Sequence, residues 1–238
     1  MIQKIFKLYP IVYLIISFNS QNLLAKSICV KNNTLMNKKM NIDIEYPQIS
    51  IPSKLNIAIT KLINQEKSFY LKCLNYDYPQ KNTSEVYQNS SLNISYNIDY
   101  QTSNFISVAV YSTNSIYGSA HGSDNVTTFN YTLADDKLLS FQNCFIPKSN
   151  YLTIIKNLTA TDLAKQLAKE KTLNINTIKT LIEAKNKTFK NFSLTKTQLI
   201  IYFNEYEVFP YFMGIQKANI AIKTLKKYLR PEILNILK

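Results

Sequence analysis

The stretch Phe105-Ile-Ser-Val-Ala-Val-Tyr111 decides how this chain folds. Apolar residues occur on both of its faces, which is typical of a strand in the middle of a sheet. The segments 92–98 and 129–133, on either side of it, alternate apolar and polar residues. That period of two predicts strands with one buried face. We therefore expect a sheet with a central strand at 105–111 and two further strands flanking it in sequence.

The segment before this sheet begins with the same period of two and then changes to helical spacing. Ile42, Ile44 and Tyr46 alternate with polar residues and predict another strand. Ser53 is a typical helix N-cap, and the helix after it is expected to run to about Cys73. The apolar residues of this helix recur at helical spacing and are expected to share one buried face. They are Leu55, Ile59, Leu62, Ile63 and Phe69.

The second half of the chain has a different period. From about 150 to 187 the apolar residues follow helical spacing, with a cap expected at Thr161. Two strands are expected next, at Leu199–Phe203 and Ala218–Ile222. The last element is a helix over 224–237, which a proline breaks.

Helices and strands are mixed in this order without strict alternation, so the predicted fold class is α+β. Two small units, each a mixed sheet with helices, are expected at 41–134 and 135–238. No long linker separates them, and they are expected to pack as one compact module.

The N-terminus has the order of a secretory signal peptide. Two lysines precede the short apolar run Leu8–Phe18, and a polar stretch follows. Residues 1–25 are predicted to be the signal peptide, with cleavage after Ala25. Leu23 is bulky where a small residue is preferred, so an uncleaved membrane anchor is the alternative. Residues 26–40 are polar and lysine-rich and are expected to form a linker, and the mature protein is expected to be periplasmic or secreted.

Composition limits the possible functions. The 238 residues include 28 Lys and Arg against 15 Asp and Glu, a net charge of +13. This charge fits either an anionic partner or the compositional bias of a chain rich in Lys, Asn, Ile and Tyr. Arg230 is the one arginine, and specific nucleic-acid contacts favour the arginine fork, so no specific nucleic-acid partner is expected. Three glycines and a single histidine argue against a phosphate loop or a site of several histidines, so no cofactor and no metal are expected.

Cys29, Cys73 and Cys144 would face an oxidising compartment after export. They allow one disulfide with three possible pairings, or three isolated thiols. No Cys-x-x-Cys spacing is present, which argues against a zinc ribbon or a thioredoxin-like site.

Several motifs together resemble a known arrangement of extracytoplasmic domains. The resemblance is to the paired domains of unknown function in RsiV-type anti-sigma factors, to the N-terminal region of PdaC-type peptidoglycan deacetylases, and to secreted mycobacterial MPT-type antigens. It runs from about Asn41 to Leu229, and at Ser119 the chain departs from the glycine usual in the family. The motifs are IEYPQIS (44–50), ISVAVYS (106–112), YGSAHGS (117–123), TTFNYTLADDKLLSFQNCF (127–145) and FSLTKTQLIIYFNEYEVFPYFMG (192–214).

The resemblance implies an extracytoplasmic α+β module. In the RsiV-type proteins the module is a receptor for lysozyme, but no sigma-binding region precedes the apolar run here, so that signalling role is not expected. The zinc-dependent catalytic domain of the deacetylases is not expected here either. Like net charges would also oppose binding of a basic lysozyme.

Two clusters of residues are candidates for a site. His121 lies between Ser119 and Ser123, with Asp124 adjacent, and is expected to be a structural loop residue rather than the base of a hydrolase. Glu205 and Glu207 are spaced so that they could flank a glycosidic bond. The aromatic residues around them are expected to pack in the core, or alternatively to form a ligand-facing patch; they are Tyr206, Phe209, Tyr211 and Phe212.

The function expected from these features is an exported, non-enzymatic binding module of the bacterial cell envelope. Its partner would be an extracytoplasmic protein or a cell-envelope polymer, and it would meet the membrane only through an uncleaved N-terminal segment. The alternative is a cell-envelope hydrolase that uses His121 or the Glu205/Glu207 pair. No catalytic residue is assigned, and the candidate binding residues are Tyr117, His121, Glu205, Tyr206, Phe209 and Tyr211.

Overall fold

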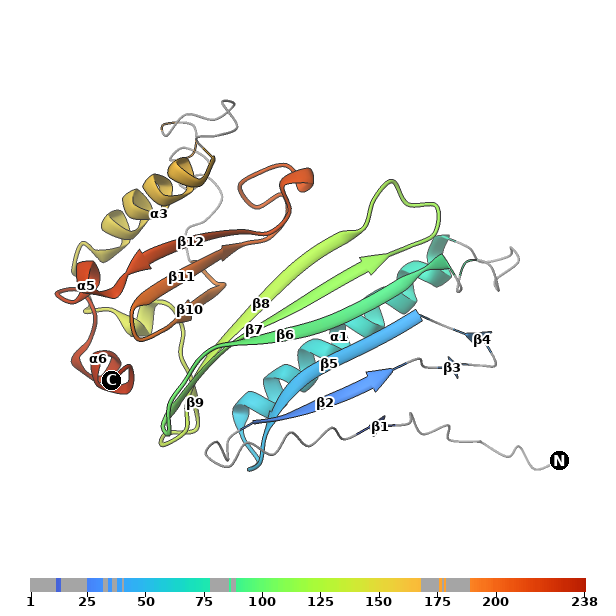
Figure 1. The fold of residues 1–238 in the computed structure, drawn as a ribbon, viewed down its shortest axis with the longest axis horizontal. Coiled ribbons are helices and arrows are strands. Elements are labelled where there is room, and N and C mark those ends of the chain that lie inside the picture. Colours follow the sequence, from blue (N-terminus) through green and yellow to red (C-terminus); the bar gives the residue numbers. More distant parts are fainter. Residues whose placement is uncertain are drawn as a thin grey trace.

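The computed structural model describes residues 12–13, 25–31, 34–35, 38–39, 41–77, 86, 89–167, 176, 178 and 189–238. It has a seven-stranded sheet in the order β1-β2-β5-β6-β7-β8-β9 and a three-stranded sheet in the order β10-β11-β12, with a small hairpin β3-β4 (Figure 1). The expected α+β class is confirmed.

The elements have the following bounds. The strands are β1 (Val12–Tyr13), β2 (Ala25–Lys31), β3 (Thr34–Leu35), β4 (Lys38–Lys39), β5 (Asn41–Ile49), β6 (Ser91–Gln101), β7 (Phe105–Ser115), β8 (Ser123–Thr132), β9 (Lys137–Leu138), β10 (Phe192–Leu194), β11 (Gln198–Phe203) and β12 (Gln216–Ala221). The helices are α1 (Lys54–Asp77), α3 (Tyr151–Leu167), α5 (Ile222–Leu225) and α6 (Pro231–Ile236), with 3-10 turns η1 (Gln142–Cys144) and η3 (Tyr211–Met213).

Strand β7 is the centre of the first sheet, as its sequence predicts. It pairs antiparallel with both β6 and β8, and residues 105–110 are buried on both faces. Strands β5 and β6 pair in parallel, and α1 forms the crossover between them. The crossover helix covers one face of the sheet, where Ile106, Val108 and Val110 join its core.

Helix α1 begins as expected and ends later than expected. The backbone N–H of Asn56 donates to the Ser53 hydroxyl at 3.1 Å, which is the predicted N-cap. The expectation that Phe69 faces the core is wrong, because its side chain is 56% exposed. Tyr70 is buried instead, since it lies eleven residues after Ile59, which is about three helical turns.

Asp136, in a turn of the seven-stranded sheet, contacts the first residue of α1. It lies in the turn between β8 and β9, and its Oδ1 accepts hydrogen bonds from the Lys54 N–H and the Tyr131 hydroxyl, both at 2.8 Å. These donors, the Lys54 N–H first, lower the pKa of Asp136 below its usual value. The ionised carboxylate is therefore the form that folding favours.

We expect Asp136→Asn to flatten the dependence of stability on acid pH. A depressed folded-state pKa contributes stability above the unfolded-state value of about 3.9, and this contribution disappears as the pH falls through the folded-state pKa. Urea unfolding between about pH 7 and pH 2 would measure the effect, with Asp135→Asn in the same turn as the charge-matched control. Parallel loss of stability in Asp136→Asn and the unmodified protein would contradict this role.

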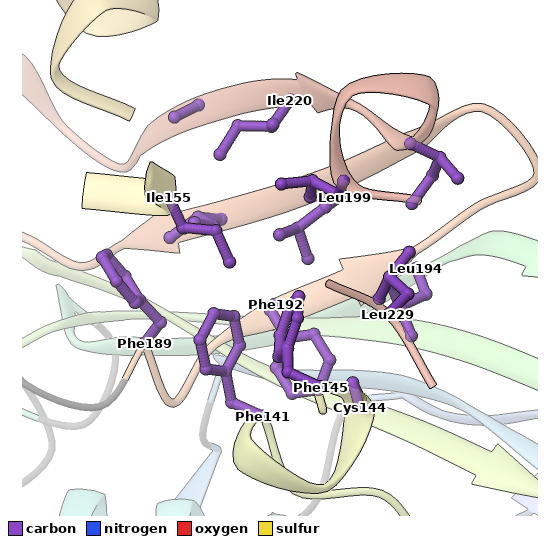
Figure 2. Close-up of a cluster of buried hydrophobic side chains, with 14 of the residues drawn as sticks. Phe141, Cys144, Phe145, Ile155, Phe189, Phe192, Leu194, Leu199, Ile220 and Leu229 are labelled. Carbon is purple, nitrogen blue, oxygen red and sulfur yellow. The ribbon is translucent and has the colours of Figure 1, made fainter. Parts of the chain in front are cut away.

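The second sheet packs on the face of the first sheet opposite α1. The other face of the second sheet contacts a core of aromatic residues. Figure 2 shows the rings of Phe141, Phe145, Phe189 and Phe192 gathered beneath β10 and β11. Helix α3 packs against β12 on the other side of this core. The helix starts at Tyr151, so the cap expected at Thr161 is wrong.

Hydrogen bonds from buried polar groups join the two sheets. The amide of Asn130 on β8 donates to the Phe192 carbonyl at 2.7 Å and accepts from the Leu194 N–H at 3.0 Å. Asp99 on β6 accepts from the hydroxyls of Ser193 and Tyr202. Burial, together with the Asp99 carboxylate, raises the pKa of Tyr202. These contacts fix β10 and β11 against the first sheet and thereby position the loop after β11.

The N-terminal part of the chain differs from the expected linker. Within 26–40, strand β2 pairs antiparallel with β5, and β3 pairs with β4. The edge of β5 offers unpaired backbone groups, and pairing with β2 satisfies them, which composition alone does not predict. Of the expected signal peptide 1–25, Val12–Tyr13 pair with β2 and Ala25 begins β2; the remainder lies outside the described residues. Within the described ranges, no helix has both the length and the apolar character needed to cross a bilayer.

Candidate functional site

Two loops distant in sequence contact each other. The loop between β7 and β8 carries His121, and the loop between β11 and β12 carries Tyr206 and Tyr211 (Figure 1). The Tyr206 hydroxyl lies 3.0 Å from His121 Nε2. The His121 and Tyr211 rings are stacked, with centroids 4.0 Å apart and planes 8° apart. We call His121, Tyr206, Tyr211 and Phe212 the aromatic cluster; Phe212 meets Tyr211 edge-on at 6.3 Å.

The β7–β8 loop is shaped by its small residues. Gly118 has a φ of 81°, in the region that favours glycine. A Cβ on Gly122 would lie 3.0 Å from the Asn114 carbonyl oxygen, so a larger residue there would displace the backbone. The Ser119 hydroxyl lies within donating distance of the carbonyl oxygens of Ile116 (2.7 Å) and His121 (3.1 Å). Ser119 therefore ties the loop to itself.

The hydrogen bonds of His121 indicate which ring nitrogen carries the proton in the neutral form. Nδ1 lies 2.6 Å from the Gly122 carbonyl oxygen, which can only accept. In the neutral ring Nδ1 therefore carries the proton, and Nε2 accepts from the Tyr206 hydroxyl. The imidazole plane is held by this pair of contacts and by the stacked Tyr211 ring.

The β11–β12 loop holds Tyr206 in an unusual backbone conformation. Tyr206 has a φ of 61°, which is uncommon for a residue with a bulky side chain. The turn is closed by the Asn204 N–H, which donates to Glu207 Oε2 at 2.8 Å, and Asn204 Oδ1 accepts from the Val126 N–H of β8 at 2.7 Å. The first sheet thus supports the backbone that presents Tyr206.

The structure separates the predicted site residues into exposed and buried groups. Core packing is confirmed for Phe209, which is buried, and is wrong for the three other aromatic residues. Tyr206, Tyr211 and Phe212 are 55%, 41% and 73% exposed. Tyr117 is exposed in the same loop as His121, and its N–H donates to the Ser90 hydroxyl.

The two glutamates have different surroundings. Glu207 closes the turn through Asn204, so its carboxylate has a structural role. Glu205 is half-buried, and its Oε2 is buried without a hydrogen-bond partner among the described residues.

The residues of the possible Ser-His-Asp arrangement are engaged elsewhere. The Ser119 hydroxyl donates to backbone carbonyls, and Asp124 Oδ1 accepts from the Thr113 hydroxyl at 2.6 Å. The His121 ring contacts Gly122 and Tyr206. A catalytic relay needs the base to contact both the nucleophile and the orienting acid, and the hydrogen bonds of these residues do not form one. In the part of the chain that the structure describes, no group of three or more His, Cys, Asp or Glu side chains could hold a metal ion.

Cys73 and Cys144 are free thiols. Cys144 is buried and donates to the Ser140 carbonyl at 3.4 Å, and burial raises the pKa of its thiol to about 12. The thiol is therefore uncharged at neutral pH and unreactive. The side chain of Cys29 lies outside the described residues.

Comparison with known proteins finds a matching family model and a curated relative. Residues 142–223 match the family described as "Protein of unknown function (DUF3298)". Peptidoglycan-N-acetylmuramic acid deacetylase PdaC of Bacillus subtilis is 24% identical over 204 residues, which are 85% of this chain and 42% of PdaC. The chain thus spans less than half the length of this curated relative.

Two solved structures share the fold. A DUF3298 family member from Bacteroides fragilis aligns with a TM-score of 0.61 and 18% identity, over 92% of this chain and 99% of that one. A DUF3298 family protein from Pseudomonas aeruginosa PAO1 aligns with a TM-score of 0.56 and 16% identity, over 88% of this chain and 94% of that one. The resemblance to a region of PdaC-type deacetylases, inferred from the sequence motifs, is confirmed, and the chain carries a DUF3298-like domain within an arrangement that resembles part of PdaC.

Proposed function

We propose that this protein is an exported, non-enzymatic binding module of the bacterial cell envelope that recognises the glycan of peptidoglycan. The aromatic cluster is the observation that carries this proposal. Its rings are exposed, the His121 and Tyr211 rings are stacked, and β8 supports the loop that carries Tyr206 through the Val126–Asn204 hydrogen bond. Little conformational entropy is therefore lost when a ligand binds. Aromatic rings offer flat apolar faces to the C–H faces of sugars, and the Tyr206 hydroxyl adds a polar group.

Two further observations support the polymer and the compartment. The relative PdaC is named for its action on a peptidoglycan sugar. The short apolar run after two lysines at the N-terminus has the order of an export signal. A protein partner is the weaker alternative, because the net charge of +13 opposes association with basic envelope proteins.

We expect Tyr211→Ala to weaken retention on purified peptidoglycan sacculi by about tenfold or more, because central aromatic contacts dominate the energy of binding surfaces. Co-sedimentation over a range of sacculus concentrations would measure the change. The unfolding midpoint should remain near that of the unmodified protein, because the ring is exposed.

Phe69→Ala is the matched control for Phe212→Ala, because Phe69 is an exposed aromatic residue on α1, outside the aromatic cluster. Phe212→Ala should reduce retention and Phe69→Ala should not. Equal retention of the unmodified protein, Tyr211→Ala and Phe212→Ala would refute the proposal.

A hydrolase is the second candidate, and Glu205 is the observation that favours it. Glu205 Oε2 is buried without a hydrogen-bond partner among the described residues, and Glu205 precedes Tyr206 of the aromatic cluster, so its carboxyl group is the candidate acid. Incubation with sacculi would then release soluble glycan fragments, and Glu205→Gln would abolish that release. Binding without release would leave the module non-enzymatic.

A further inference from the structure

A small recess lies where the end of β8 meets the C-terminal helix α6. Its volume is about 190 Å³, and its lining comes from the β8–β9 hairpin, from η1 and from α6. Pockets for drug-sized ligands have volumes of about 300–1,000 Å³, so this recess suits a smaller molecule. The loop that carries His121 precedes β8 and the recess follows it, so the length of the strand separates the two by about 30 Å. The recess is therefore a different place from the aromatic cluster.

Part of the lining of this recess is apolar. Ile233 of α6 is 2% exposed, and Leu139 and Ile236 are partly buried against the same core as Phe145. These side chains offer a surface to an aliphatic group of a few carbons, which gains free energy by leaving water. An inorganic ion has no group that could use this surface.

The rest of the lining includes two positive and two negative side chains. They are Asp135, Lys137, Arg230 and Glu232, and their formal charges cancel. Asp135 and Lys137 line the same recess, yet neither belongs to an ion pair or to a side-chain hydrogen bond within the described part of the chain. Opposite charges that line one recess without pairing are available to a ligand that itself carries both charges.

Arg230 is the single arginine among 28 basic residues, and two contacts hold it in place. Its backbone N–H donates to the Cys144 carbonyl at 3.1 Å, and its Nε donates to the Phe145 carbonyl at 2.9 Å. Nη1 lies 3.6 Å from Glu232 Oε1, which is longer than a charge-assisted hydrogen bond of about 2.7–2.9 Å. The Nη groups therefore keep hydrogens for a planar carboxylate. A guanidinium binds such a group through two parallel hydrogen bonds, and a lysine ammonium does not.

These features select among small ligands. The carboxylates of Asp135 and Glu232 repel a phosphate dianion. A simple carboxylate would pair with Arg230 and leave Asp135 unpaired, and a simple amine would do the reverse. An α-amino acid carries a carboxylate, an ammonium group and a side chain on one carbon, and its net charge of zero matches that of the lining.

We propose that this recess binds a free α-amino acid with a short aliphatic side chain. The Arg230 guanidinium binds the carboxylate, Asp135 binds the ammonium group, and Leu139, Ile233 and Ile236 contact the aliphatic side chain. This inference goes beyond the proposed function, because it concerns a second site with a ligand of its own.

Titration of the isotope-labelled full chain with valine, followed through NMR chemical shifts, tests the inference. Two matched probes each lack one charge: 3-methylbutanoate has no ammonium group, and isobutylamine has no carboxylate. We expect valine to bind about tenfold more tightly than either probe, because each probe loses one charge-assisted contact. Inorganic phosphate is the fourth probe and should show no saturable binding.

Four variants assign the contacts. Ile236→Trp should abolish valine binding because the larger ring fills the recess, and Asn235→Trp is the matched control. Asn235 is the adjacent, exposed residue of α6 and does not line the recess, so its variant should keep the affinity. Asp135→Asn should remove the advantage of valine over 3-methylbutanoate. Arg230→Lys keeps the charge but loses the planar fork, and it should weaken the binding of both carboxylates by about tenfold.

The outcomes separate this inference from the proposed function. Equal affinity of the unmodified protein for valine and 3-methylbutanoate, or valine binding that persists in Ile236→Trp, overturns the inference. Saturable binding of phosphate that is tighter than that of valine makes the recess an anion site and also overturns it. Tyr211→Ala should bind valine as the unmodified protein does, whatever its retention on sacculi, since the aromatic cluster lies at the other end of β8. Asp135 is exposed, so Asp135→Asn still tests the ammonium contact if Arg230→Lys or Ile236→Trp fails to fold.

Discussion

Asn130→Ala is expected to lower the free energy of unfolding by about 3–5 kcal/mol, because it leaves several buried polar groups without partners. The Asn130 side chain is 1% exposed and joins the two sheets. It accepts from the Ser107 hydroxyl at 2.8 Å and from the Leu194 N–H, and it donates to the Phe192 carbonyl. An alanine methyl group replaces none of these bonds. Urea unfolding followed by far-UV circular dichroism would measure the loss.

Asn104→Ala is the matched control, since Asn104 is exposed in the turn between β6 and β7. Its effect should stay within about 0.5 kcal/mol. A loss below about 1 kcal/mol in Asn130→Ala would show that the Asn130 hydrogen bonds contribute little to holding the two sheets together.

Phe145→Ala is expected to cost about 3–5 kcal/mol, the range for removing a large aromatic side chain from a packed core. The Phe145 ring is fully buried, stacks on Tyr151 with centroids 4.5 Å apart, and lies 5.0 Å from Phe141 (Figure 2). Its backbone carbonyl accepts from Arg230 Nε at 2.9 Å, and the substitution leaves this bond in place. The measured change therefore reports the packing of the ring.

Phe212→Ala is the control for ring size, because the Phe212 side chain is 73% exposed. The unfolding midpoint of Phe212→Ala should stay near that of the unmodified protein, and the midpoint of Phe145→Ala should lie well below both. Similar midpoints would mean that the core around Phe145 can rearrange to fill the cavity.

Strands with a clear period of two were predictable from the sequence, and short or locally constrained elements were not. The central strand at Phe105 and the cap at Ser53 follow from residue pattern alone. Strand β10 has three residues, too few to show a period, and its pairing depends on β11 and Asn130. Thr161 has the chemistry of a cap, but its hydroxyl donates to the Asn157 carbonyl inside α3.

The candidate site was predictable in its residues and not in their exposure. His121, Tyr206 and Tyr211 were selected from sequence motifs, yet core packing was the expectation for the two tyrosines. The positive φ of Tyr206 and the turn closed by Glu207 reverse which aromatic residues face the solvent, and no periodicity signals that reversal.

The core shown in Figure 2 also determines which segment of the gene must be inherited together for its product to fold. The family match ends at residue 223 and begins at 142, but the same core includes Phe105 of β7 before that range, and Leu229 and Ile233 after it. A gene fragment that encodes only the matched range would leave the apolar surfaces under Phe105 and Leu229 in water. Recombination between genes would therefore preserve a folded product only when the exchanged segment also carries β7 and the C-terminal segment with α6. The segment that must be inherited together is therefore longer than the one that the family model matches.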